Sequence, residues 1–201
     1  MTIDTKDMLN SILQSISRID YVKPQDIPNI DLYMDQVTTF MESQLGSTRR
    51  HGEDKILTKT MINNYAKNNL LPPPVKKKYS KEHVLVLIFI YYFKNILSIR
   101  DIETLLAPLT EKYFHNGEAF DITSVYEEVC SLEKSRIDQL AKDIAKMYHT
   151  ASGTFEDAPA GDREALQLFS FICSLAFDVY VKKLLMEKLI DQMPEPEKKS
   201  K

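Results

Sequence analysis

Along most of the chain, apolar side chains recur every three or four residues, which is the spacing of one face of an α-helix. The first such pattern covers residues 5–19, and Asp4 or Thr5 is suited to cap its N-terminus. After a connector with two prolines, the second pattern covers residues 30–45, with Asn29 as its expected cap. The sequence therefore predicts an α-helix at each of these two places.

A short polar helix is predicted next, from Thr58, its expected cap, to about residue 69. Its apolar side chains fall on one face and leave a polar face of lysines, threonines and asparagines. Three consecutive prolines at 72–74 cannot continue a helix, and they predict a stiff extended corner behind it.

Residues 84–93 are apolar nearly all round, which predicts a helix at the centre of a domain, capped by Ser80. Another helix is expected to begin at Ser98 and to end near Pro108. Few glycines and no tryptophan, with many Leu, Ile, Lys and Glu, also favour helices over sheets. The predicted fold class is all-α.

Two long helices are predicted in the C-terminal half. Residues 123–148 carry an amphipathic stripe, whose alternatives are core packing and a coiled-coil-like seam between two copies. Residues 163–190 are more apolar, but polar positions interrupt them too often for a membrane span. Their aromatic side chains are more typical of core packing than of a pocket for an unknown small-molecule effector. These side chains are Phe169, Phe171, Phe177 and Tyr180.

Positive charge is concentrated in one stretch of a chain that is nearly neutral overall. Residues 46–82 carry nine Lys and Arg against three acidic residues, a net charge of +6. The flanking segments are acidic, with three basic and seven acidic residues over 1–45 and 14 basic and 19 acidic residues over 83–201. Such segregation focuses positive potential on one patch, and a merely solvated lysine-rich face is the alternative interpretation.

The polar helix and the basic corner together suggest DNA binding. The major groove admits an α-helix, Asn bonds adenine through two hydrogen bonds, and Lys bonds guanine or phosphate. Lysines behind the corner suit the phosphate backbone, whose neutralisation supplies much of the affinity. Tyr79 either packs beneath the corner, which is favoured, or bonds a phosphate. The candidate DNA-binding residues are Arg49, Arg50, Thr58, Lys59, Thr60, Asn63, Asn64, Lys67, Lys76, Lys77, Lys78 and Tyr79.

A family resemblance lies in the order TxxxxNxYxKxxLLPPPxxKxYSxEHV, which starts at Thr58 and is followed by SIxDIxxLL. This order resembles the DNA-binding domain of MerR-type winged helix-turn-helix regulators. The matching residues are Tyr65, Leu70, Leu71, Pro72, Pro73, Tyr79, Ser80, Glu82, Ser98, Ile99 and Ile102. As a whole, the chain also resembles an uncharacterised bacterial family of unknown function that carries a MerR-like domain.

The resemblance implies a winged helix-turn-helix that contacts the groove with the polar helix and the backbone with the lysines. The segment between Pro74 and Tyr79 is shorter than the usual wing, so a shortened wing is expected. The expected parts are an N-terminal helix and connector at 1–27, the helix-turn-helix domain at 28–108, a helical domain for dimerisation and any sensing at 121–192, and a disordered tail at 193–201.

The sequence carries no enzyme signature, because it has no glycine-rich phosphate loop and its four histidines lack a second metal ligand at a suitable spacing. We therefore expect no enzyme activity, no cofactor and no metal. Cys130 and Cys173 lie in apolar helical patterns, which predicts buried free thiols, with a disulfide or redox sensor as the alternative. Because no signal peptide is recognised at the N-terminus, a cytoplasmic location is expected.

These observations predict a dimeric, sequence-specific transcription regulator that binds the double-stranded DNA of a promoter and does not associate with membranes. The alternative is a helical adaptor that docks an acidic protein on the same basic face. Salt-dependent binding to duplex DNA distinguishes the two hypotheses.

Overall fold

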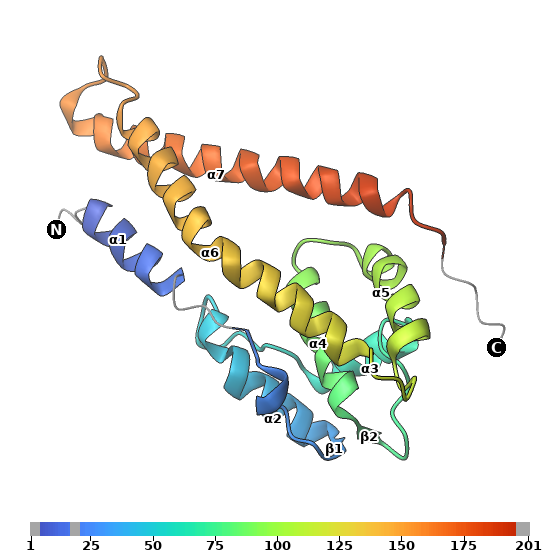
Figure 1. The fold of residues 1–201 in the computed structure, drawn as a ribbon. Helices are drawn as coiled ribbons and strands as arrows, with labels where there is room; N and C mark the ends of the chain where they lie inside the picture. Colours follow the sequence, from blue (N-terminus) through green and yellow to red (C-terminus); the bar gives the residue numbers. More distant parts are fainter. Residues whose placement is uncertain (1–4, 17–20, 196–201) are drawn as a thin grey trace. The chain divides into compact units, whose positions relative to one another are not determined.

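The computed structural model describes residues 5–16 and 21–195 and is built mainly from helices (Figure 1). Among these residues the one sheet has only two strands of two residues each, so the all-α prediction is confirmed. The chain divides into two compact units. The larger unit consists of Val22–Glu128 and continues from Met186 onward, and the smaller unit consists of the chain up to Tyr21 and Val129–Leu185.

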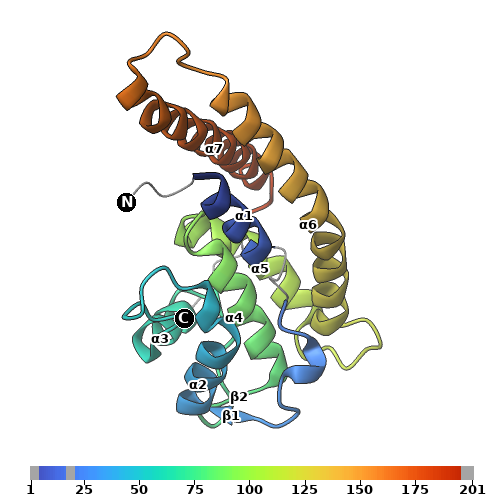
Figure 2. The same ribbon diagram turned by 90° about the vertical axis from the view of Figure 1, so that its left-hand side faces the viewer.

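The larger unit is organised around one buried helix, which confirms the prediction of a central helix. Its elements are β1 (Leu32–Tyr33), α2 (Met34–Leu45), α3 (Lys59–Lys67), β2 (Lys78–Tyr79), α4 (Lys81–Phe93), α5 (Ile99–Tyr113) and the start of α6 (Ile122–Ser152), with 3-10 turns at Pro24–Asp26 and Gly46–Thr48. Every residue of α4 from His83 to Ile90 is buried. Figure 2 shows α4 among α2, α3 and α5.

The helix predicted from residue 30 begins only at Met34, because the two residues before it form a strand. Leu32 pairs with Tyr79 and Tyr33 with Lys78 in an antiparallel register. The backbone N–H of Tyr33 then donates to the Gln36 side chain at 2.8 Å, which caps the first turn of α2. The cap therefore lies at Tyr33 and not at Asn29.

The helix predicted to end near Pro108 runs on to Tyr113, so that prediction is wrong. The Thr110 hydroxyl lies 3.1 Å from the carbonyl oxygens of Leu106 and Ala107 and donates to them around the interrupted turn. Folded structure also continues past the predicted domain end at residue 108. Tyr126 at the start of α6 is buried, and its hydroxyl donates to the Val22 carbonyl at 2.8 Å.

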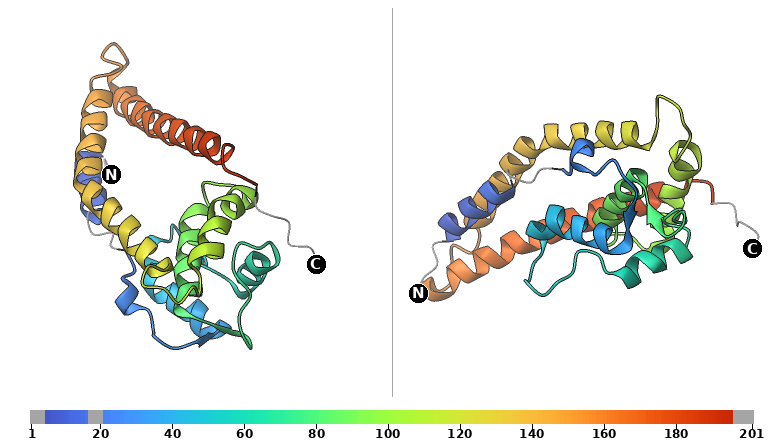
Figure 3. Two further views of the ribbon diagram at one scale, coloured as in Figure 1. Left: turned by 45° about the vertical axis from the view of Figure 1, so that its right-hand side comes forward. Right: turned by 90° about the horizontal axis from the view of Figure 1, so that it is seen from below.

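The smaller unit consists of α1 (Thr5–Ile16), most of α6, and α7 (Ala160–Ile190) up to Leu185. The helices α6 and α7 meet at the loop that joins them, with the chain running toward this loop in α6 and away from it in α7 (Figure 3). Phe171 and Ala151 are buried between them, and Leu13 of α1 packs against this cluster. The predicted cap at Asp4 and all but the first three residues of the predicted tail at 193–201 lie outside the described residues.

The helical pattern predicts that both cysteines are buried, and neither of them is. Cys173 is exposed on α7, and Cys130 is only partly buried. The periodicity locates an apolar face correctly, but it does not say whether another element covers that face. Within the described segments, no helix has an apolar stretch long enough to cross a bilayer.

Candidate nucleic-acid interface

The short helix α3 presents the polar face that the sequence predicts. The Thr58 hydroxyl oxygen accepts the backbone N–H of Met61 at 3.1 Å and caps the helix. Ile62 and Tyr65 are buried and attach the opposite face to the domain. The exposed side chains of the helix are Lys59, Thr60, Asn63, Asn64 and Lys67.

The C-terminal end of α3 is closed by a Schellman motif. The backbone N–H of Leu70 donates to the Tyr65 carbonyl at 2.9 Å, and that of Asn69 donates to the Ala66 carbonyl at 3.4 Å. Asn69 adopts the left-handed conformation that this motif requires, with φ 57°. Leu70 and its neighbour Leu71 are buried. Both ends of the helix are thus fixed, and its outer face is held in one orientation.

The candidate residues on α3 differ in how free their side chains are. Within the described part of the chain, Asn63 and Lys67 make no side-chain hydrogen bond or ion pair. Lys59 instead forms an ion pair with Asp35 in the first turn of α2. The face available to a ligand is therefore centred on the middle and C-terminal turns of α3, and Lys59 is partly neutralised.

A two-residue hairpin follows the proline corner. The backbone N–H of Val75 donates to the Lys78 carbonyl at 3.1 Å, and the Lys78 N–H donates back at 2.9 Å. Lys76 and Lys77 form the turn with φ values of 51° and 65°, both left-handed, and both side chains are exposed. A turn with two positive φ values normally takes Asn-Gly, and the left-handed conformation costs an ordinary side chain roughly 1–2 kcal/mol. The sequence thus tolerates strain to place two lysines at this tip.

The other two residues of the predicted basic corner are less accessible. Tyr79 is only 3% exposed, burial raises the pKa of its hydroxyl, and its ring lies edge-on to His83. The packing role favoured for Tyr79 is therefore confirmed, and Tyr79 is removed from the candidate DNA-binding residues, because β2 turns its side chain inward. Lys78 is half-buried, with its ammonium 5.3 Å from the centre of the Tyr33 ring.

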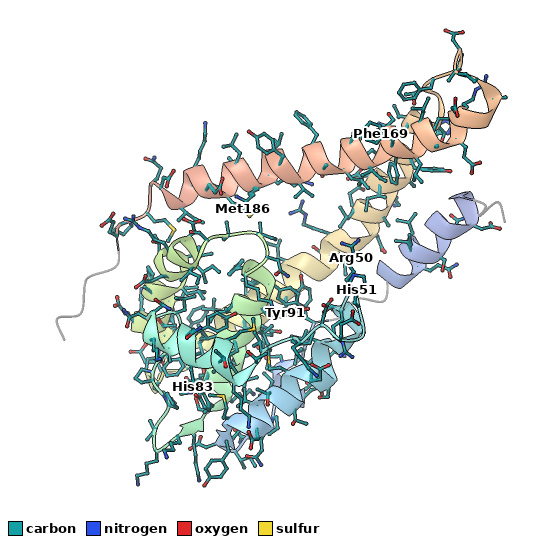
Figure 4. The ribbon with its side chains drawn as sticks, turned by 180° about the vertical axis from the view of Figure 1, so that it is seen from behind. Arg50, His51, His83, Tyr91, Phe169 and Met186 are labelled. Atoms are coloured by element: carbon teal, nitrogen blue, oxygen red, sulfur yellow. The ribbon has the colours of Figure 1, made fainter. Side chains whose placement is uncertain are left out.

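Of the two arginines predicted to bind DNA, Arg49 is engaged within the protein. Its guanidinium forms an ion pair with Glu42 at 2.7 Å and donates to the Gly46 carbonyl at 3.0 Å. It therefore ties the loop after α2 to that helix. Arg50, labelled in Figure 4, is exposed in the same loop.

The continuous part of the larger unit has nearly the same bounds as a match to a known protein family. Residues 22–129 match the family described as Domain of unknown function (DUF1836), and the continuous part of the larger unit is Val22–Glu128. The chain belongs to the DUF1836 family. No curated protein and no solved structure matches the chain. The family match also extends beyond the domain predicted at 28–108, in agreement with the buried start of α6.

Two residues that support the site in this DUF1836 domain were not singled out from the sequence. The Lys94 ammonium donates to the Ile56 carbonyl at 2.7 Å, and burial lowers its pKa. It thereby holds the chain just ahead of α3. His83 accepts the Ser80 backbone N–H on Nδ1 at 2.9 Å, and a Ser followed three residues later by a polar side chain is the sequence signal for such a cap.

His83 also packs against the strand that follows the lysine hairpin, where its ring lies edge-on to Tyr79. Burial lowers its pKa from 6.5 to about 4, while the backbone carbonyls of Pro73 and Pro72 act in the opposite direction. The imidazole is therefore neutral near pH 7, and it accepts on Nδ1, so Nε2 carries the proton. Nε2 has no hydrogen-bond partner among the described residues, so the ring is held by the Ser80 cap and by its edge-on contacts with Tyr79 and Phe114.

A polar hollow of about 520 Å³ at the N-terminus of α4 has the opposite electrostatic character. Its lining includes Asp31, Glu82, Glu118 and Asp121, and the His115 Nδ1 lies 2.6 Å from the Glu82 carboxylate. Four carboxylates outnumber the one lysine of the lining, Lys81, and disfavour a polyanion. The DUF1836 domain thus separates an acidic hollow from the basic hairpin.

Proposed function

We propose that the DUF1836 domain of this chain binds duplex DNA with sequence preference and acts as a transcription regulator. The exposed face of α3 enters the major groove, and the hairpin lysines contact the phosphate backbone. The observation that carries the proposal is the pair of strained, exposed lysines at the tip of the hairpin that follows α3. Backbone strain of this kind persists where a function needs the side chains in place.

The dimensions and side chains of α3 suit the major groove. An α-helix with its side chains is about 10–12 Å across, and the major groove is about 12 Å wide, so α3 can lie in it. Asn63 has an unengaged amide that matches the donor and acceptor pair of adenine. Lys67, one turn further along the same face, suits guanine or phosphate.

The charge distribution supports contact with a polyanion. The net charge of +6 lies within residues 46–82, which include α3 and the hairpin. Because Arg49 and Lys59 are paired within the protein, the cations of this segment that remain exposed include Lys67 on α3 and Lys76 and Lys77 on the hairpin. The basic surface is therefore narrower than the sequence alone suggests.

The order of elements also supports a likeness to MerR-type winged helix-turn-helix domains. A helix, a polar helix, a proline corner, a short hairpin and a central helix follow one another in the same order. The hairpin corresponds to a wing reduced to its turn. One difference is the connection between α2 and α3, residues 46–58, which is longer than the usual three- or four-residue turn.

The backbone contact is tested by the salt dependence of DNA binding. Fluorescence anisotropy with a labelled duplex is measured from 50 to 300 mM salt for the wild type and for Lys76→Gln/Lys77→Gln. Two lost phosphate contacts make the slope of log affinity against log salt shallower by about 1.8. The control Lys142→Gln/Lys146→Gln removes the same charge from two exposed positions of α6 and leaves the slope unchanged.

Base contact by α3 is tested with Asn63→Ala. This variant should lower the preference for one duplex sequence over a scrambled one, because a bidentate contact to adenine contributes about 1–3 kcal/mol of discrimination. Its affinity for the scrambled duplex should stay the same. If the wild type binds an acidic protein but no duplex at 50 mM salt, the adaptor hypothesis replaces this one.

A further inference from the structure

The outer surface of α7 carries an apolar stripe that is left uncovered within the smaller unit. Its six positions are spaced three or four residues apart, so that all of them lie within an arc of about 100° around the helix. The six positions of the stripe are Ala165, Phe169, Cys173, Ala176, Tyr180 and Leu184, and all six are exposed. Phe169, labelled in Figure 4, is 62% exposed, and Tyr180 is 61% exposed.

The side-chain sizes along the stripe are complementary to those of a second, antiparallel copy of the same stripe. When two copies of α7 run antiparallel about a point between residues 174 and 175, Phe169 lies opposite Tyr180. Cys173 then lies opposite Ala176, and Ala165 lies opposite Leu184. The small pair at the centre lets the helices approach closely, and the aromatic pairs on either side fill the wider spaces.

The charges of α7 favour the same orientation. Asp162 and Glu164 lie in its first turns, and the Arg163 guanidinium between them donates to the carbonyls of Glu156 and Ala158 in the preceding loop. Near its other end, Lys182 forms an ion pair with Asp178, and Lys183, Glu187 and Lys188 leave one net positive charge. An antiparallel pair places each acidic start beside a basic end, and it also opposes the two helix dipoles.

The apolar area is comparable with that of a stable interface. Phe169, Phe177 and Tyr180 are each more than 60% exposed and together leave roughly 300–500 Å² uncovered. Ile172 and Leu184 beside them are 53% and 39% exposed and bring the total toward the ~800 Å² that each partner of a standard complex buries. Monomeric proteins rarely leave a contiguous apolar patch of this size open.

We infer that α7 is the dimerisation element of this protein, pairing with α7 of a second copy in antiparallel orientation through the stripe from Ala165 to Leu184. The pairing is isologous, because the same stripe serves both copies about a two-fold axis. The inference is independent of DNA binding, since each of its tests is made on the protein alone.

Orientation is tested by disulfide cross-linking in the full chain with Cys130→Ser and Cys173→Ser. Ala165→Cys and Leu184→Cys are made separately, mixed and oxidised. Antiparallel pairing gives the mixed 165–184 disulfide. It gives no 165–165 disulfide, because those positions are about 28 Å apart along the helix axis and a disulfide spans at most about 7 Å between Cα atoms. A 165–165 disulfide, or no cross-link at all, overturns the inference.

The stripe itself is tested by two substitutions of nearly equal exposure. Tyr180 is 61% exposed on the stripe, and Leu185 is 58% exposed about 100° beyond its edge around α7. Sedimentation equilibrium should show a dimer for the wild type and for Leu185→Glu. For Tyr180→Glu the dissociation constant should rise about 30-fold or more. A monomeric wild type, or the same effect of both substitutions, overturns the inference.

Discussion

Replacing Lys76-Lys77 by Asn-Gly separates the conformational cost of the hairpin from its charge. Both lysines have positive φ values in a two-residue turn. This turn favours Asn-Gly, because Asn and Gly adopt left-handed conformations more readily than lysine does. The double substitution Lys76→Asn/Lys77→Gly should therefore keep the hairpin and relieve its strain while it removes two positive charges.

The expected gain in stability follows from the two dihedral angles. Relief of left-handed strain at two residues gains roughly 2–4 kcal/mol at most. Glycine makes the unfolded chain more flexible, which lowers the free energy of unfolding by about 0.5–1 kcal/mol. Asparagine in the left-handed conformation still has part of the strain of an ordinary residue. A net gain of about 1–2 kcal/mol in the free energy of unfolding corresponds to a Tm roughly 2–8 °C higher in a chain of this length.

The affinity for DNA should fall although the stability of the fold rises. The Asn-Gly variant loses two phosphate contacts, so the slope of log affinity against log salt becomes shallower by about 1.8. Thermal unfolding and fluorescence anisotropy are measured on the same preparations. The control Lys76→Arg/Lys77→Arg keeps both strain and charge, so its Tm and its salt dependence should match the wild type.

Either half of this expectation can fail separately. A variant that is more stable and binds DNA with an unchanged salt slope refutes the phosphate contacts. A variant that loses binding without any gain in Tm refutes the strain at the turn. A more stable variant with weaker binding supports the view that the lysines are kept at this tip for their charge.

The remaining predictions concern the supports of the site. The pKa of His83 is about 4 in the fold and 6.5 in a free side chain, so the unfolded chain takes up the proton first as the pH falls. Wild-type stability should therefore fall by about 3 kcal/mol from pH 7 to below pH 4, and urea unfolding of His83→Gln should lack this part of the decrease. Asn69→Ala should lower the free energy of unfolding by about 1 kcal/mol, whereas Asn69→Gly should leave it equal or higher, because only alanine opposes φ 57°. Ile62→Ala should cost about 2–5 kcal/mol in urea unfolding because the side chain is fully buried; a loss below 1 kcal/mol would contradict that packing.

Local signals in the sequence were sufficient for the helices of the candidate site. Thr58 and Ser80 occupy cap positions, and the apolar run of α4 indicates burial without any knowledge of its partners. Each of these signals acts over three or four residues of the chain, which is the range of helical hydrogen bonds. The polar face of α3 was predictable for the same reason.

Features that depend on distant partners were not predictable. The pairing of Leu32 with Tyr79 joins segments far apart in the sequence, and it shortens α2. The ion pair of Lys59 with Asp35 likewise joins two elements, so charge counting overestimated the free cations. The lysine turn has no glycine or asparagine at its centre, so it lacks the usual sequence signal of a tight hairpin.

The most direct test of DNA recognition is selection of bound sequences from a pool of randomised duplexes by the purified full chain. The account predicts that one sequence motif is enriched over several rounds and that this enrichment is lost with Asn63→Ala. Recovery of the pool without enrichment, at a salt concentration where the protein still binds, would contradict sequence recognition by α3.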